Sequence, residues 1–294
     1  MTGDEPSWVI DAHTHAFPSE WVADRSAHLR ADLWFGELYK APDARMVDAT
    51  GLLAAMDAAG VDQAIMCGWP WADPGRCREH NDYLAAASGE SQGRFAWLGT
   101  VAPGSMGAAA EAERCLGLGA RGVGELNADA QGFDVASDGA LLDIATVLEG
   151  AKRPLLLHAS EPVGHRYPGK GTATPDRLLT FVANNPGLTL VLAHWGGGLP
   201  FYELMPEIAE LTANVVYDSA ASSYLYRSGV FRTVLDIVGE DRVLWGSDHP
   251  VLGMKTFLRK TRQGSMLGAD EMQKVLGLNA RRVYRLVDTG GSRL

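Results

Sequence analysis

The sequence predicts a single α/β domain, a (β/α)8 TIM barrel, over residues 1–294. Three observations support this prediction: eight short aliphatic runs alternate with stretches of helical periodicity, several runs are continuously apolar, and metal-binding residue types follow them directly. Strands that are buried on both faces of a parallel sheet are continuously apolar, as residues 155–157 and 190–192 are. Barrels of this kind have about 250 residues, so the chain fits one domain.

The expected strands are residues 8–12, 61–67, 95–101, 120–126, 154–157, 188–193, 214–217 and 242–245. The expected helices are residues 50–59, 79–88, 106–118, 140–149, 174–183, 201–211, 230–238 and 254–263, with a last helix over 271–287 that packs across the closed barrel. Thr174 and Pro175 are typical of a helix start, and Pro206 should kink or split the sixth helix. An open doubly wound sheet shows the same alternation, but the count of eight and the missing GxGxxG motif favour closure.

Composition and charge limit the partners. The chain has 36 acidic and 26 basic residues, a formal net charge of -10, and no Lys/Arg cluster along the sequence, so nucleic acid is not expected. Three cysteines without metal-like pairing predict reduced thiols, and the N-terminal residues lack a signal-peptide pattern. No apolar run reaches the roughly 20 residues of a membrane span. We therefore expect a cytoplasmic protein with a small-molecule substrate, and the sequence leaves a homo-oligomer open.

Residue types that bind metals stand at the ends of five expected strands. They are His13 and His15 after the first strand, Glu125 at the end of the fourth, His158 after the fifth, His194 after the sixth and Asp248 after the eighth. The chemistry of such barrels lies at the C-terminal ends of the strands, so these side chains should converge on one mouth. Side chains two apart on a strand point the same way, so His13 and His15 can reach one ion.

Imidazoles and carboxylates without a thiolate suit zinc, and also manganese, iron or cobalt. Zinc is the first choice because it is the commonest ion in such sites. A dication lowers the pKa of a coordinated water from about 15.7 to near 7, which supplies hydroxide at neutral pH. Asp248 can then serve both as a ligand and as the catalytic acid and base.

These motifs resemble the amidohydrolase superfamily, in particular the amidohydrolase-2-type metal-dependent hydrolases, a branch that also contains metal-dependent decarboxylases. The resemblance runs from residues 9–15 through 192–197 and 245–250 to 277–282. It implies a barrel in which His13, His15, His158 and Asp248 are metal ligands. It further implies that His194 binds a second metal or orients water and substrate.

Glu125 decides how many ions are expected. Some members of the superfamily bridge two ions with a carboxylate at the end of the fourth strand, which is the place of Glu125. In that case His158 and His194 would hold the second ion, and His13, His15 and Asp248 the first. The alternative is a glutamate that forms a salt bridge inside the mouth of a one-ion site. Both interpretations stay open at this stage.

Substrate-binding candidates come from four loops on the same face of the barrel, those after the first, second, fifth and seventh expected strands. The loop after the fifth strand offers His165, Arg166 and Lys170, which could neutralise a carboxylate, and the alternative is a solvated surface loop. Trp21, Trp69 and Trp71 could form apolar walls, although core packing is the commoner fate of tryptophan. Tyr224 and Arg227 follow the seventh strand and could donate hydrogen bonds to an oxyanion.

Three functions follow, in decreasing order of preference. The first is a metal-dependent hydrolase in which activated water attacks the carbonyl of an amide, lactam or lactone, with Asp248 and His194 as catalytic residues. The second is a non-oxidative decarboxylase of an aromatic or unsaturated acid. The third is a metal-stabilised barrel that binds a ligand without turning it over.

Overall fold

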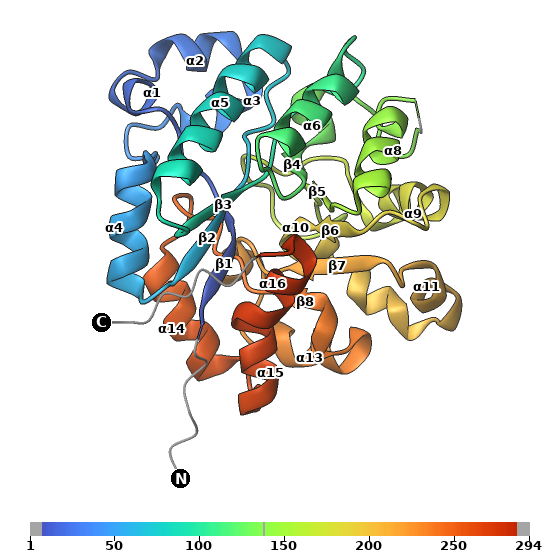
Figure 1. Cartoon of the computed structure of the whole chain (residues 1–294). Helices are drawn as coiled ribbons and strands as arrows, with labels where there is room; N and C mark the ends of the chain where they lie inside the picture. Colours follow the sequence, from blue (N-terminus) through green and yellow to red (C-terminus); the bar gives the residue numbers. More distant parts are fainter. Residues whose placement is uncertain (1–7, 138, 287–294) are drawn as a thin grey trace.

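The computed structural model describes residues 8–137 and 139–286, and these form a barrel of eight parallel strands surrounded by helices (Figure 1). The strands are β1 (Ile10–Thr14), β2 (Gln63–Met66), β3 (Phe95–Trp97), β4 (Val123–Leu126), β5 (Leu155–Leu157), β6 (Leu190–Leu192), β7 (Val215–Asp218) and β8 (Val243–Leu244). Each lies in or within two residues of an expected strand. The predicted barrel is confirmed.

The barrel closes at two seams where the pairing is reduced to single bridges. Strands β1 to β3 pair in order, and β4 to β8 pair in order, all in parallel. A bridge between Gly99 and Val123 joins β3 to β4, and one between Thr14 and His249 joins β1 to the end of β8. The backbone N–H of Ala12 also donates to the carbonyl of Trp245 at 2.9 Å. The C-terminal ends of the first and last strands therefore lie side by side.

The surrounding helices are α4 (Ala49–Ala59), α5 (Pro74–Glu90), α6 (Ala108–Gly117), α8 (Leu142–Ala151), α9 (Pro175–Asn184), α13 (Val230–Val238) and α14 (Met254–Gly264). Helix α5 begins five residues before its expected start, because Asp73 accepts a hydrogen bond from the N–H of Arg76 and Pro74 occupies the first turn. Pro206 splits the sixth helical region as predicted, into η1 (Leu199–Leu204) and α11 (Pro206–Leu211). Within the described residues, no helix combines the length and apolarity needed to cross a membrane.

Several short helices were not predicted from the sequence, because they are shorter than the stretch of residues over which helical periodicity can be recognised. The segment after β1 forms α1 (Ser19–Ala23), α2 (Ser26–Ala31) and α3 (Leu33–Tyr39), and single turns form α7 (Ala128–Gln131), α10 (Ala193–Gly196), α12 (Ser222–Leu225) and η2 (Glu240–Arg242). Helices α1 to α3 pack Phe35 and Tyr39 against Phe17, Trp69 and Trp71. This aromatic cluster covers part of the barrel mouth.

The C-terminal segment closes the opposite end of the barrel. The single helix expected over 271–287 is instead α15 (Ala269–Gln273), a π-helical stretch η3 (Lys274–Leu278) and α16 (Asn279–Tyr284), and residue 287 lies outside the described residues. Ala280, Val283 and Tyr284 pack on the inward-facing residues of the strands, such as Ile10 and Leu244. Helix α16 thereby covers the N-terminal ends of the strands, in front of the barrel in Figure 1.

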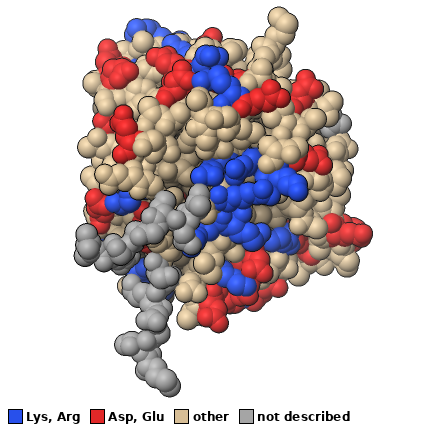
Figure 2. Space-filling view, in the orientation of Figure 1, with Lys and Arg blue, Asp and Glu red and all other residues tan. Residues whose placement is uncertain are grey.

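Basic side chains gather on this closed end, contrary to the expectation from the sequence. Figure 2 shows lysine and arginine side chains grouped on this face. Arg121 and Arg153, which precede β4 and β5, donate to the carbonyls of Arg285 and Tyr284 at 3.4 Å each. Burial and the charges of Arg121 and Arg285 lower the pKa of Arg153. These arginines are more than 30 residues apart along the chain, so no run of charges in the sequence reveals their clustering.

We expect Tyr284→Ala to lower the free energy of unfolding by about 3–5 kcal/mol, because it leaves a cavity under the barrel floor. The side chain is fully buried, and its hydroxyl makes no hydrogen bond with any described residue. The matched control, Tyr284→Phe, should stay within about 1 kcal/mol of the parent protein. Urea unfolding followed by circular dichroism measures both, and equal stability of Tyr284→Ala and the parent would contradict this role of α16.

Candidate metal centre

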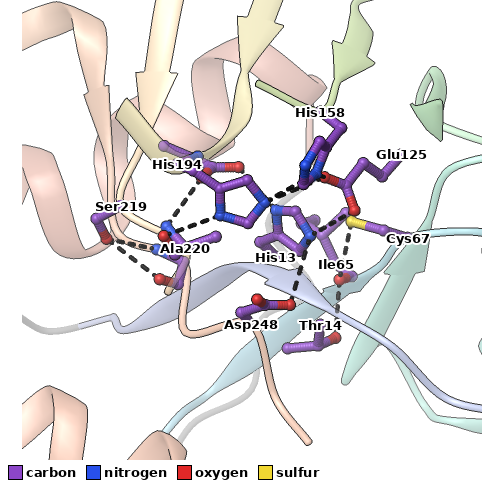
Figure 3. Close-up of polar contacts among 12 residues, drawn as sticks. His13, Thr14, Ile65, Cys67, Glu125, His158, His194, Ser219, Ala220 and Asp248 are labelled. Carbon is purple, nitrogen blue, oxygen red and sulfur yellow. Dashed lines mark hydrogen bonds and ion pairs between the residues drawn. The ribbon is translucent and has the colours of Figure 1, made fainter. Parts of the chain in front are cut away.

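The C-terminal ends of five strands bring six potential ligands together at the mouth of the barrel. Figure 3 labels all of them except His15. His13 lies within β1 and His15 directly after it, and Glu125 belongs to β4. His158 follows β5, while His194 lies in α10 after β6 and Asp248 after β8. All are buried except His158, which is partly buried. The structure thus brings every expected metal-binding residue to one place.

The six side chains form two triads of potential ligands. In the first triad, His13 Nε2 lies 3.3 Å from His15 Nε2, and Asp248 Oδ1 lies 3.6 Å from His15 Nε2 and 4.0 Å from His13 Nε2. The second triad consists of Glu125, His158 and His194. The resemblance implies one ion held by His13, His15, Asp248 and His158, but the structure places His158 in the second triad.

Glu125 lies between the two triads and contacts both with different oxygens. Its Oε1 is 2.9 Å from His158 Nδ1 and 3.3 Å from His194 Nε2. Its Oε2 is 3.4 Å from His13 Nε2 and 3.7 Å from His15 Nε2. A carboxylate with one oxygen on each side can bridge two cations, and it can equally form ion pairs with protonated imidazoles. These contacts are therefore compatible with both interpretations from the sequence, a carboxylate that bridges two ions and a carboxylate that forms ion pairs in a one-ion site.

Gly124 allows Glu125 to take this position. A Cβ atom on Gly124 would lie 2.5 Å from both the backbone oxygen and the Cβ of Leu156, and the glycine has a φ of 139°. An L side chain is therefore excluded both by contact and by backbone conformation. The close approach of β4 to β5 at this point holds the glutamate at the centre of the site.

The outward nitrogens of three histidines are held by oxygen acceptors. His13 Nδ1 pairs with Asp218 Oδ2 at 2.8 Å, His15 Nδ1 with the carbonyl of Cys67 at 3.2 Å, and His194 Nδ1 with the carbonyl of Ala220 at 3.1 Å. Each acceptor favours a proton on Nδ1, so the lone pair of Nε2 faces the site. His158 is oriented the opposite way, because its Nε2 pairs with the carbonyl of Gly169 at 3.1 Å and its Nδ1 faces Glu125.

Asp218 is a positioning residue that the sequence analysis did not select. It ends β7, is fully buried, and its second oxygen, Oδ1, accepts hydrogen bonds from the backbone N–H groups of His194 and Ala220. One carboxylate therefore orients His13 directly and fixes the turn that presents His194. Its place at a strand end, in line with the other ligands, is the sequence signal that could have identified it.

The charges of the cluster are strongly coupled. Burial would raise the pKa of Glu125, but the imidazoles of His13 and His158 hold it well below its usual range. Burial would lower the pKa of His194, but its hydrogen bond and the charge of Glu125 raise it to about 9. Burial and the neighbouring His13 lower the pKa of His15. The carboxylates thus favour positive charge between them, but the crowding of the imidazoles opposes a proton on His15. A divalent cation would supply the positive charge without that proton.

A hollow of about 680 Å³, including the space open to solvent, lies above the triads. Its walls are largely apolar or aromatic and include Trp69 and Tyr224, two of the expected substrate-binding residues. It also reaches residues that the sequence analysis did not select, namely Trp34, Leu38, Asn127, Tyr167, Leu225 and Val251. Ligand pockets commonly enclose about 300–1,000 Å³, so a small molecule fits.

The other expected substrate-binding residues do not line this hollow. Trp21 and Trp71 are buried in the aromatic cluster, where the indole N–H of Trp71 donates to His80 Nδ1 at 3.2 Å. His165 and Lys170 face a neighbouring hollow, and Arg166 lines a third. Arg227 follows α12 and is not among the lining residues. These six residues therefore lie outside the hollow above the triads, and their role in substrate binding stays a prediction.

The chain matches one protein family. A family model described as Amidohydrolase covers residues 10–286. No functionally curated protein matches the chain in sequence.

Several solved structures share the fold. A 5-carboxyvanillate decarboxylase from Sphingomonas paucimobilis is 21% identical with a TM-score of 0.78, over 95% of this chain and 99% of that one. The corresponding enzyme from Novosphingobium aromaticivorans, solved with manganese and 3-methoxy-4-hydroxy-5-nitrobenzoic acid, is 22% identical with a TM-score of 0.79, over 97% and 99%. A 2,6-dihydroxybenzoate decarboxylase from Rhizobium is 20% identical with a TM-score of 0.72, over 95% and 99%. At these identities the comparison shows a shared fold.

We expect Asp218→Asn to weaken divalent metal binding by about 10- to 100-fold. The amide would present an N–H toward His13 Nδ1 and so disfavour the ring form whose Nε2 lone pair faces the site. Competition with a chromophoric chelator measures the affinity.

The matched control for this measurement is Asp143→Asn, a change of the same kind on an exposed side chain. It should leave the affinity unaltered. Equal metal affinity of Asp218→Asn and Asp143→Asn would rule out the positioning role of Asp218.

Proposed function

This chain belongs to the amidohydrolase family, and we propose that it is a metal-dependent decarboxylase that removes CO2 non-oxidatively from an aromatic or unsaturated carboxylic acid. The observation that supports this proposal is the pair of ligand triads beneath a largely apolar hollow. The same fold is found in decarboxylases that act on hydroxylated benzoic acids. A flat acid fits such a hollow with its carboxylate toward the triads.

The hydrolase that the sequence analysis placed first is corrected by these comparisons. The similar structures described above that have a named reaction are decarboxylases, and they cover nearly the whole chain. The residue types alone do not separate the two reactions, because imidazole and carboxylate ligands with an aspartate acid suit both. The second prediction from the sequence, decarboxylation, is the one that the comparisons favour.

We further propose that the site has two cation positions. His13, His15 and Asp248 would hold the first cation, and His158 and His194 the second, with Glu125 between them. The supporting geometry is the separation of the ligands into two triads and the division of the Glu125 oxygens between them. Zinc stays the prediction from the ligand types, and the manganese in a similar structure makes manganese the other ion to test.

A divalent cation here would act as a Lewis acid that holds the substrate carboxylate and a neighbouring oxygen. The apolar walls at Trp69, Leu225 and Val251 would orient the ring and exclude water from it. This exclusion of water matters because decarboxylation converts a charged carboxylate group into uncharged CO2. An environment without water favours that loss of charge.

Asp248 is the proposed proton donor. Its Oδ1 lies 3.6 Å from His15 Nε2, and the residue lines the hollow in which the acid would bind. The acid form would give its proton to the ring carbon that carries the carboxylate. The C–C bond then breaks, its electron pair restores the ring, CO2 leaves, and solvent returns a proton to Asp248. His194, as a proposed ligand of the second cation, would act on the carboxylate through that ion, since it lines the same hollow.

We expect the metal-loaded protein to release CO2 from at least one member of a panel of hydroxybenzoic acids. Asp248→Asn should lower kcat by about 10²–10⁴-fold, the usual contribution of a positioned acid. A CO2-coupled assay measures the rate, and metal content measured in parallel separates a lost proton donor from a lost ligand. Asp143→Asn serves as the exposed control. Full activity of Asp248→Asn at equal metal content would exclude the proposed donor.

The number of cation positions is tested by metal analysis. We expect two divalent ions per chain in protein purified without chelator, and one or fewer in Glu125→Gln, because an amide does not bridge two cations as a carboxylate does. Inductively coupled plasma mass spectrometry gives the content. One ion in both proteins would remove the two-cation proposal and leave Glu125 as an ion-pair partner.

A further inference from the structure

We propose that Asn127 is a substrate-binding residue whose side-chain amide N–H donates a hydrogen bond to the carboxylate of the acid. This proposal rests on the proposed function, because it assumes an acid whose carboxylate lies at the ligand triads. It deepens that function by adding a neutral donor from the protein to the cations that would hold the carboxylate. Three observations support it: the side of the chain on which Asn127 lies, the fixed orientation of its amide, and a donor atom without a protein partner.

The end of β4 directs the side chain of Asn127 toward the mouth of the barrel. Asn127 follows β4 directly in an extended conformation, with a φ of -133° and a ψ of 118°. Side chains two apart on an extended chain point to the same side, so Asn127 shares its side with Glu125. Leu126, between them, belongs to the hydrophobic core that the strands form with the surrounding helices. Glu125 and Asn127 therefore both lie on the side of the triads.

The neighbouring strand end lies at the same height as Asn127. Leu126 pairs with Leu157 in the parallel register of β4 and β5, and the N–H of His158 donates to the carbonyl of Leu126 at 2.8 Å. Asn127 is therefore the neighbour of His158, a candidate ligand in the second triad. It is 2% exposed and lines the hollow above the triads. The residue thus reaches the part of the hollow that is next to the ligands.

The turn after β4 fixes the orientation of the amide. Asn127 Oδ1 accepts hydrogen bonds from the N–H groups of Asp129 and Ala130 at 3.0 Å and 3.1 Å, and so caps α7. The amide nitrogen cannot accept these hydrogen bonds, so the flipped amide is excluded. The backbone N–H of Asn127 donates to Gln131 Oε1 at 3.1 Å, and Gln131 Nε2 donates to two backbone carbonyls. These contacts hold the residue at both its backbone and its side-chain oxygen.

The nitrogen of the amide is the donor that this arrangement leaves over. Asn127 Nδ2 carries two N–H groups and makes no hydrogen bond with any described residue. Unlike the indole nitrogen of Trp69, it is not sealed from solvent. Because Asn127 is otherwise buried and lines the hollow, this access leads into the hollow. A carboxylate has about four lone-pair positions, so it can accept from the amide while it also binds cations.

Two variants separate ligand binding from helix capping. Asparagine, serine and aspartate cap helices about equally well, so Asn127→Ser and Asn127→Asp both keep the cap of α7. We expect zinc-loaded Asn127→Ser to bind benzoate about tenfold more weakly than the parent protein, because the amide donor is lost. Asn127→Asp should bind benzoate more weakly still, since its carboxylate repels that of the ligand. Isothermal titration calorimetry at equal zinc content measures both affinities.

The matched control is Asn184→Ser, a change of the same kind on an exposed side chain, which should bind benzoate as the parent does. A capping role alone predicts unchanged benzoate binding in Asn127→Ser and in Asn127→Asp. That result would overturn the proposal.

A measurement on the parent protein detects the hydrogen bond directly. Isotopic labelling of asparagine gives the nuclear magnetic resonance signals of the side-chain amides, and the signal missing from both variants identifies Asn127. We expect benzoate to move one amide proton of Asn127 downfield in the zinc-loaded protein, because a carboxylate acceptor deshields the proton that it binds. A signal that stays in place while benzoate saturates the site would overturn the proposal.

These results are separable from the decarboxylase proposal, because benzoate binding is measured without turnover. Absence of CO2 release from the hydroxybenzoic acids together with the expected losses of benzoate affinity would reject the reaction and keep Asn127 as a carboxylate-binding residue. CO2 release together with unchanged benzoate binding in Asn127→Ser would keep the reaction and reject the role of Asn127. Failure of the parent protein to bind benzoate at millimolar concentration would overturn the proposal, whatever the CO2 assay shows.

Discussion

The contact of one carboxylate with four imidazoles is the constraint on which the mouth of the barrel depends. Glu125 lies within 2.9–3.7 Å of His13, His15, His158 and His194, which come from three different strand ends. In the absence of this negative charge, protonated imidazoles at these distances would repel one another. The barrel supplies the proximity, and Gly124 supplies the close approach of β4 to β5 that the glutamate needs.

A second layer of contacts turns this proximity into a defined orientation. Asp218 holds the Nδ1 of His13 and the backbone at His194, while carbonyls of Cys67 and Ala220 hold His15 and His194. All of these acceptors are buried, so their hydrogen bonds are shielded from water. These contacts hold the ligand nitrogens toward the site, which lowers the free-energy cost of assembling a metal site.

The sequence predicted the barrel and the side chains that meet at its mouth, because both follow from local patterns. Continuous apolar runs identify strands of a parallel barrel, and His13, His158 and Asp248 stand directly after such runs. The sequence offered the division into two triads as one of two interpretations and could not choose between them, since distances across the mouth depend on how far each strand end reaches. Asp218 looks like any other polar strand end until its contact with His13 is seen. The indole N–H of Trp71 donates to His80, whereas that of Trp69 has no acceptor among the described residues. No local sequence pattern predicts this difference.

The segment of α1 to α3 offers a place where the substrate preference of this enzyme can change. It contributes Trp34 and Leu38 to the wall of the hollow and packs against Trp69, yet it contains none of the candidate ligands. Residues 19–39 lie between β1 and α4, outside the strands that carry the ligands. Altered acceptance of acids can therefore arise in this segment, by natural divergence or in a directed-evolution library, while the reacting groups are inherited unchanged.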